Sequence, residues 1–155
     1  MSQENVEIVM RAVNAVNQSN LLVGGSNPLS VLHEFDPHLE WDLSRRGVDP
    51  EIYHGYEGWL RFTEEFRDAW QEYRFDVEEV IDAGESVVLF GHNTGLAKSG
   101  IKLSVRVGQV WTLRDGKIVR WQFFGEDRAA CLEAVGQTKK DSPTDVYGEN
   151  WSDQS

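Results

Sequence analysis

The sequence predicts an α+β domain in which helices cover one face of a curved antiparallel sheet. Two patterns carry this prediction. Apolar residues at helical spacing dominate the first half of the 155-residue chain, and four strand-like runs follow one another in the second half. A chain of this length buries one core and is too short for two ordinary domains. We therefore expect one domain over residues 1–136, followed by a polar, flexible tail over residues 137–155.

Three helices are predicted in the first half of the chain. Valines at three- and four-residue spacing predict an amphipathic helix from about residue 2 to residue 20. A short helix that begins at Asn27-Pro28 is expected to end at Asp36-Pro37, because the residue before a proline disfavours helical backbone. After a short strand, "HLEWDL", a third helix with an aromatic face is predicted from Tyr56 to Gln71.

The second half of the chain is a predicted meander of strands. Tight turns are expected at Ala83-Gly84, Ser99-Gly100 and Asp115-Gly116, and the last of these is the strongest short hairpin signal. A closing helix is predicted over residues 126–135, with Gly136 placed to end it. The expected strands cover residues 73–82, 86–97, 101–113 and 117–125.

Composition excludes several classes of partner. The formal net charge of -11 and the absence of a basic cluster argue against a nucleic-acid partner. No apolar run reaches membrane-spanning length, and the polar, acidic N-terminus differs from a signal peptide. Cys131 is the single cysteine, which excludes an internal disulfide. We expect a cytoplasmic protein that binds neither nucleic acid nor a membrane.

The turns predict which residues share a face of the sheet. If Ser99-Gly100 and Asp115-Gly116 are two-residue loops, one otherwise apolar face also carries polar side chains near its middle. An unpaired buried amide costs on the order of 1–3 kcal/mol, so these groups need partners, water or a ligand. The three predicted rows are His92, Val107 and Phe124; Phe90, Gln109 and Gln122; and Val88, Trp111 and Arg120.

A cavity under the helices is one interpretation of this face, because small-molecule sites are usually apolar with a few converging polar groups. The alternative is a filled core, in which the two glutamines bond each other, His92 is a satisfied core histidine and Arg120 reaches water over Trp111. On the opposite face, an apolar patch is expected to form a homodimer interface. That patch consists of Val110, Val119, Trp121 and Phe123.

Four stretches, "HLEWDL", "YHGYEGWLRF", "VWTLRDGKIVRWQFF" and "DRAACLEAVG", resemble in combination the SnoaL-like branch of the nuclear transport factor 2-like (NTF2-like) superfamily. The likeness covers residues 1 to about 136. The resemblance implies a cone-shaped α+β fold with a pocket between the helices and the concave sheet, commonly a homodimer through the outer sheet face. The superfamily includes ketosteroid isomerases, polyketide cyclases, dehydratases, epoxide hydrolases and non-catalytic binding proteins, so the fold alone does not choose a function.

The resemblance places a pocket carboxylate at Asp42, near the end of the first strand. His92 is a candidate acid–base partner for it, and Arg120 a candidate cation for a substrate carboxylate or an oxyanion. Gln109 stands where the isomerases place a proton-donating acid, and an amide cannot donate that proton. A solvent-facing Asp42 at the strand end stays an open alternative.

We therefore expect a cofactor-independent isomerase, cyclase or dehydratase that transfers protons on an apolar, oxygen-bearing molecule. The alternatives are a non-catalytic binding or accessory protein, an epoxide hydrolase-like enzyme, or a dimerisation module with a filled cone. No metal is expected, because His33 and His38 are separated by a helix end and a proline. No nucleotide-binding motif is present. The residues expected to bind substrate are Trp41, Tyr53, Trp59, Phe62, Phe90, Val107, Gln109, Trp111, Gln122 and Phe124.

Overall fold

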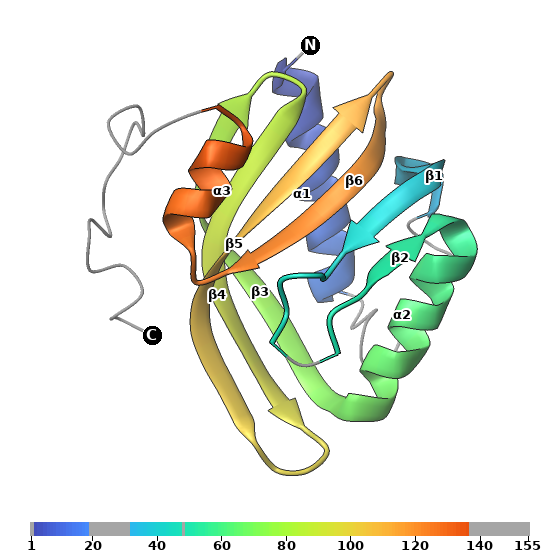
Figure 1. Cartoon of the computed structure of the whole chain (residues 1–155), viewed down its shortest axis with the longest axis vertical. Helices are drawn as coiled ribbons and strands as arrows, with labels where there is room; N and C mark the ends of the chain where they lie inside the picture. Colours follow the sequence, from blue (N-terminus) through green and yellow to red (C-terminus); the bar gives the residue numbers. More distant parts are fainter. Residues whose placement is uncertain (1, 19–31, 48, 137–155) are drawn as a thin grey trace.

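The structure is a computed structural model, and it describes residues 2–18, 32–47 and 49–136. The predicted tail over residues 137–155 lies outside this part of the chain. Within the described residues, three α-helices accompany a six-stranded sheet (Figure 1). In chain order the elements are α1 (Ser2–Gln18), β1 (Phe35–Asp42), β2 (Ile52–His54), α2 (Gly55–Ala69), β3 (Trp70–Ala83), β4 (Ser86–Ala97), β5 (Lys102–Arg114), β6 (Lys117–Gly125) and α3 (Arg128–Ala134).

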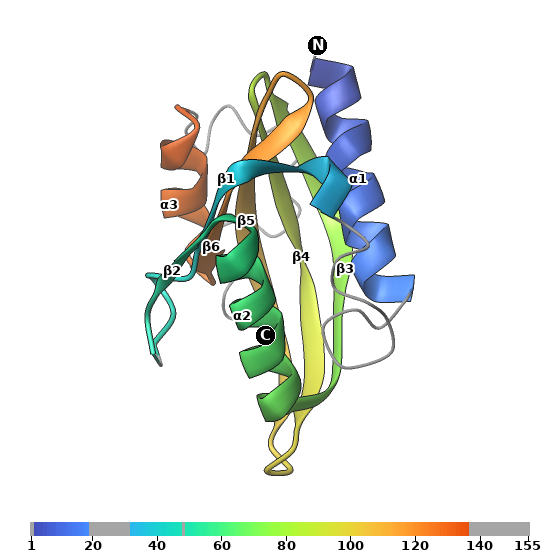
Figure 2. The ribbon, with the colours of Figure 1, turned by 90° about the vertical axis from the view of Figure 1, so that its right-hand side faces the viewer.

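The sheet has the strand order β2-β1-β6-β5-β4-β3. All neighbouring strands are antiparallel except β1 and β6, which are parallel, so the sheet is mixed. We call the face covered by α1 and α2 the inner face and the opposite one the outer face. Helix α3 lies across the sheet from α1 (Figure 2), where Leu132 packs with Val88 and Phe124 of the outer face. The expectation that all helices cover one face is therefore wrong for α3.

Most predicted elements are confirmed, including the long helices and the four strands of the meander. Asp115 and Gly116 have φ values of 52° and 78°, as a two-residue hairpin loop of this hand requires. One expectation is wrong. Residues 27–31 of the predicted short helix lie outside the described residues, but the chain around Pro37 is strand β1 and not the end of a helix. Pro37 falls where the pairing of β1 with β6 shifts in register. Strand β2 was not predicted.

The register between β4 and β5 differs from the prediction by one residue. The amide of Ala97 donates to the carbonyl of Ile101 at 2.8 Å, so the loop between these strands has three residues and not two. As a result, Leu89 pairs with Gln109, and His92 pairs with Arg106. A shift of one residue moves every side chain to the other face. His92 consequently lies on the outer face, opposite to Gln109.

A second one-residue difference arises in β6. Leu113 pairs with Ile118 as predicted, but Thr112 pairs with Arg120, which leaves Val119 as an extra residue. Such a β-bulge reverses the faces of all following residues. Trp121 therefore pairs with Trp111 on the inner face. Arg120 and Gln122 turn to the outer face.

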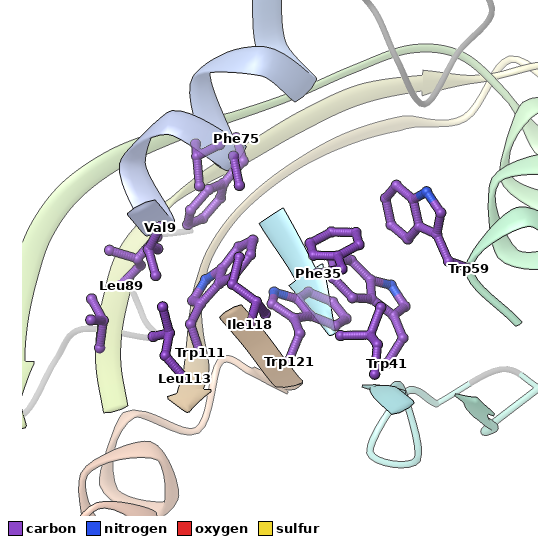
Figure 3. Packing of buried hydrophobic residues seen from close by; sticks show 14 of the residues in the cluster. Val9, Phe35, Trp41, Trp59, Phe75, Leu89, Trp111, Leu113, Ile118 and Trp121 are labelled. Carbon is purple, nitrogen blue, oxygen red and sulfur yellow. The ribbon is translucent and has the colours of Figure 1, made fainter. Parts of the chain in front are cut away.

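The main core lies between the inner face and helices α1 and α2, and it is strongly aromatic (Figure 3). Trp41 of β1 stacks on Trp121, with ring centroids 4.1 Å apart and planes 15° from parallel. The ring of Trp41 also meets Trp59 of α2 edge-on, at 4.7 Å and 71°. Offset-stacked and edge-on aromatic pairs contribute about 0.5–1.5 kcal/mol each beyond their buried area. These contacts hold α2 against the sheet.

A smaller core lies on the outer face under α3. Arg128 of α3 forms an ion pair with Glu79 of β3 at 3.0 Å, and both side chains are buried, at 5% and 7% exposure. The guanidinium of Arg128 also lies 4.1 Å from the ring centroid of Phe90. The predicted apolar dimer patch is wrong in its composition: Val110 is buried beside α3, and Trp121 and Phe123 belong to the inner face.

Candidate functional site

An internal cavity of about 210 Å³ lies between α1, α2 and the inner face. Its size is relevant to small molecules, since a dry protein cavity of about 150 Å³ holds benzene. Most of the wall is apolar, and five of the six tryptophans of the chain contribute to it. The lining residues are Val13, Val16, Asn17, Trp41, Leu43, Arg46, Trp59, Phe62, Phe66, Trp70, Tyr73, Phe75, Asn93, Leu103, Gln109, Trp111, Trp121 and Phe123.

Gln109 of β5 is the polar group deepest in the sheet, with 4% of its surface exposed. Its side-chain Oε1 accepts a hydrogen bond from Nε1 of Trp111 at 3.0 Å. An indole nitrogen only donates, so this bond fixes the orientation of the amide and leaves Nε2 as a donor. Within the described residues, Nε2 of Gln109 has no acceptor. The side-chain amide of Gln109 is therefore a hydrogen-bond donor of fixed orientation in the wall of the cavity.

Asn93 of β4 and Tyr73 of β3 form a second polar pair in the wall. The hydroxyl of Tyr73 donates to Oδ1 of Asn93 at 2.7 Å. Burial raises the pKa of Tyr73 well above its ordinary value, against a smaller opposing effect of the bond to Asn93, so the phenol stays protonated. The Nδ2 donor of Asn93 has no acceptor in the part of the chain described.

The indole nitrogens of Trp41 and Trp121 are buried and have no hydrogen-bond partner in the described structure. The side-chain amides of Gln109 and Asn93 also have an N–H group without an acceptor among these residues. In the part of the chain described, the unpaired donors of this wall are therefore all N–H groups. Asn17, by contrast, is satisfied at both ends, because its amide bonds the backbone carbonyl and the backbone N–H of Phe75 at 2.7 and 3.1 Å. The wall thus favours acceptor atoms on whatever the cavity contains.

The structure separates the predicted catalytic residues from this cavity. Oδ1 of Asp42 accepts from the backbone N–H and the hydroxyl of Ser44 at 2.8 and 2.6 Å, which closes the turn after β1. Arg120 forms ion pairs with Glu40 at 3.2 Å and with Asp42 at 3.5 Å. Nε2 of His92 lies 2.8 Å from Oγ of Ser104. All of these contacts are on the outer face, so the expected convergence of Asp42, His92 and Arg120 in the cavity is wrong.

Five of the ten expected binding residues line the cavity, namely Trp41, Trp59, Phe62, Gln109 and Trp111. The other five lie elsewhere. Phe90 and Phe124 are under α3, Gln122 faces outward beside Val110, Val107 is buried on the inner face next to the cavity, and Tyr53 lines a neighbouring hollow.

Sequence reasoning missed four polar lining residues: Asn17, Asn93, Tyr73 and Arg46. A three-residue loop between β4 and β5 would have placed Asn93 on the same face as Gln109. Arg46 lies in the loop after β1, where no periodic pattern indicates the direction of a side chain.

Two further properties concern metals and membranes. Among the described residues, no three His, Cys, Asp or Glu side chains are grouped in a way that could hold a metal ion. The helices over these same ranges are all too short or too polar to cross a lipid bilayer.

Comparisons with known proteins place this architecture in a family. Solved structures with the same fold include an NTF2-like protein of unknown function from Burkholderia pseudomallei K96243, with a TM-score of 0.66, 22% identity, and coverage of 86% of this chain and 98% of that one. TerC, co-crystallised with polyporic acid, matches with a TM-score of 0.65 and 21% identity over 85% and 98% of the two chains. A provisionally assigned SnoaL-like polyketide cyclase from Jannaschia sp. CCS1 matches with a TM-score of 0.65 and 21% identity over 86% and 92%.

These likenesses show the NTF2-like fold. No curated protein sequence matches the chain. The model of the SnoaL-like domain, however, matches residues 27–121, which is more than half of the 155 residues. The chain therefore belongs to the SnoaL-like domain family.

Proposed function

We propose that this protein binds an apolar, ring-shaped small molecule that carries acceptor oxygens such as carbonyl groups. One observation carries the proposal: the aromatic cavity holds an amide, that of Gln109, whose orientation is fixed by Trp111 and whose donor has no partner in the described structure. A ligand oxygen would give this donor the acceptor that the described residues do not supply, and such a hydrogen bond contributes about 0.5–1.5 kcal/mol. Tryptophan faces favour a flat ring system as the body of the ligand.

The composition of the wall favours binding over acid–base catalysis. Among the described lining residues, only Arg46 and Tyr73 are titratable, and the wall has neither a carboxylate nor an imidazole. A general base within hydrogen-bond reach of the substrate is a requirement of proton-transfer catalysis. The predicted isomerase, cyclase or dehydratase mechanism through Asp42 and His92 thus lacks its groups at this cavity.

A cyclase or isomerase is the second candidate, and the fixed orientation of the Gln109 donor favours it. N–H groups aimed at a carbonyl also stabilise the oxyanion that develops when the carbonyl compound enolises. The fold neighbours support a search for such substrates, because one is TerC with polyporic acid and another a provisionally assigned polyketide cyclase. Turnover of a bound carbonyl compound by the native protein, lost in a Gln109 variant, distinguishes this candidate from a binding protein.

The test compares two molecules that differ by one acceptor oxygen, 1-tetralone and tetralin. Binding is followed by the fluorescence of the wall tryptophans. We expect 1-tetralone to bind roughly fivefold to tenfold more tightly, which corresponds to about 1 kcal/mol for one hydrogen bond. Gln109→Met keeps a side chain of similar length but removes the donor, so it should abolish the preference.

The matched controls lie on the outer face. Gln122→Met makes the same substitution on the neighbouring strand, and His92→Ala removes the predicted acid–base group; both should bind 1-tetralone as the native protein does. Equal affinity of the native protein for the two molecules, or no binding of either, would overturn the proposal.

A further inference from the structure

Arg46 lies where the cavity meets a second hollow. This second hollow, of about 850 Å³, is formed by α2 and the loop between β1 and β2. Four residues line both spaces: Arg46, Phe62, Phe66 and Trp70. Three of these four are aromatic, so Arg46 is the only charged group at the junction among the described residues. A ligand in the inner cavity that extends into the second hollow passes this guanidinium.

The two glutamates of the second hollow are already engaged by another arginine, and a third carboxylate, that of Asp49, also lines this hollow. Arg61 of α2 forms an ion pair with Glu51 and a second one with Glu65, the latter at 3.2 Å. The other carboxylate oxygen of Glu65 accepts a hydrogen bond from the hydroxyl of Tyr53 at 2.6 Å. The bond from Arg61 is the main cause that lowers the pKa of Glu51, with a smaller contribution from Arg46. Glu51 is therefore held as an anion by Arg61.

Arg46, in contrast, has no carboxylate within 4.0 Å among the described residues. Its Nη2 donates to the backbone carbonyl of Asp49 at 2.7 Å, and its Nε is buried without a partner. Burial and Glu65 raise the pKa of Tyr53, and Arg46 partly opposes this rise. The phenol of Tyr53 is therefore a polar neighbour of Arg46. A guanidinium presents its N–H groups as a planar fork that matches a carboxylate.

We propose that Arg46 binds a carboxylate on the ligand of the inner cavity. The ligand class is then a monocarboxylate on an aromatic or alicyclic ring, with its ring among the tryptophans and its acid group at the junction. This inference rests on the proposed function, because it needs a ligand ring in the inner cavity. Arg46 is the charged group at the junction, and it supplies the specificity that the uncharged donors of the wall do not.

The experiment uses 2-naphthoate and 2-naphthamide, which share a ring and differ in charge. We expect the native protein to bind 2-naphthoate roughly tenfold more tightly, because hydrogen bonds to a charged group are the stronger kind. Arg46→Gln should remove this preference, while binding of 1-tetralone by the native protein tests the proposed function separately. Arg45→Gln is the matched control, since the guanidinium of Arg45 lies 4.6 Å from the ring centroid of Phe124 on the outer face. It should behave as the native protein.

Arg46→Lys is a second variant that keeps the charge without the fork, and we expect an intermediate affinity for 2-naphthoate. An Arg46→Gln variant that binds 2-naphthoate as tightly as the native protein would overturn the inference while 1-tetralone binding still upholds the proposed function. Equal affinity of the native protein for the acid and the amide would overturn it as well. A native protein that binds none of the three probes fails both proposals.

Discussion

The two faces of the sheet differ in how far their polar side chains are paired within the protein. On the outer face, charged and polar side chains are paired with one another. The pairs are Arg128 with Glu79, Arg106 with Glu78, Arg120 with Glu40, and His92 with Ser104. On the inner face, the wall of the cavity keeps N–H donors for which the described residues supply no acceptor.

This difference supports the proposed ligand site on the inner face. A buried polar group without a partner lowers stability unless water or a ligand completes it. On the outer face, charged pairs hold strands and α3 together, although Nε of Arg120 is buried without a hydrogen bond in the described structure. The inner face combines a hollow, aromatic walls and donors without acceptors among the described residues, which is the anatomy of a ligand site. The candidate acid–base residues that sequence patterns placed in the cavity lie on the outer face.

Deletion of Val119 should have the largest effect, because this residue decides which face β6 presents. Without the bulge, apolar side chains leave the inner face in one of two ways. Either Trp121 and Phe123 leave the inner face and Arg120 enters it, or the hairpin shifts and Ile118 leaves the core, where it is fully buried. We expect a loss of about 5 kcal/mol or more in the free energy of unfolding, which is on the order of the whole stability of such a domain.

Val119→Ala is the control for this deletion, because it keeps the extra residue. Urea unfolding monitored by circular dichroism should give a loss of about 1 kcal/mol for that variant. A deletion variant as stable as Val119→Ala would contradict the role given to the bulge.

The ion pair under α3 should give the next largest effect. Arg128→Met leaves Glu79 buried without its main cation, and breaking a buried pair in this way costs about 3–5 kcal/mol. The double variant Arg128→Met, Glu79→Leu should regain most of that loss, because no uncompensated charge stays behind. Urea unfolding measures both. The affinity for 1-tetralone should stay unchanged, since the pair lies on the outer face; a large change would contradict the separation of the two faces.

The sequence predicted the fold far better than the site, and two residues explain the gap. Helices and strands follow from spacing within one segment, which the sequence displays directly. The face of a side chain also depends on the number of residues in each loop and bulge. A third loop residue at Lys98 turned His92 outward, and the extra Val119 turned Arg120 and Gln122 outward.

The expected residues that do line the cavity are those that no single-residue error affected. Trp59 and Phe62 lie on a helix whose aromatic face is unambiguous, and Gln109 and Trp111 share the strand from which the rows were counted. Trp41 alternates with Asp42 on β1, so placing both in the pocket was inconsistent with strand geometry. Arg46 could not be placed, because a loop side chain has no periodicity to read.

Cys131 gives the smallest effect and tests how tightly α3 closes the outer face. Burial raises the pKa of its thiol to about 12, against a smaller opposing effect of Arg128. Because the folded pKa exceeds the unfolded value, the unfolded chain ionises first, and stability falls as pH rises from about 9 toward 12. Between pH 8 and pH 10 we expect the native protein to lose about 1 kcal/mol more than Cys131→Ala in urea unfolding.

Thiol labelling provides an independent readout of the same closure. Ellman's reagent at pH 8 should react with the folded protein roughly 100-fold more slowly than with the urea-unfolded chain, since only the thiolate attacks and α3 must open first. The Arg128→Met variant should reduce the ratio of the two labelling rates, because the ion pair to Glu79 keeps α3 packed on the sheet. Ligands of the inner cavity should leave it unchanged. Rapid labelling of the folded native protein would mean that α3 opens readily and does not close the outer face of the sheet.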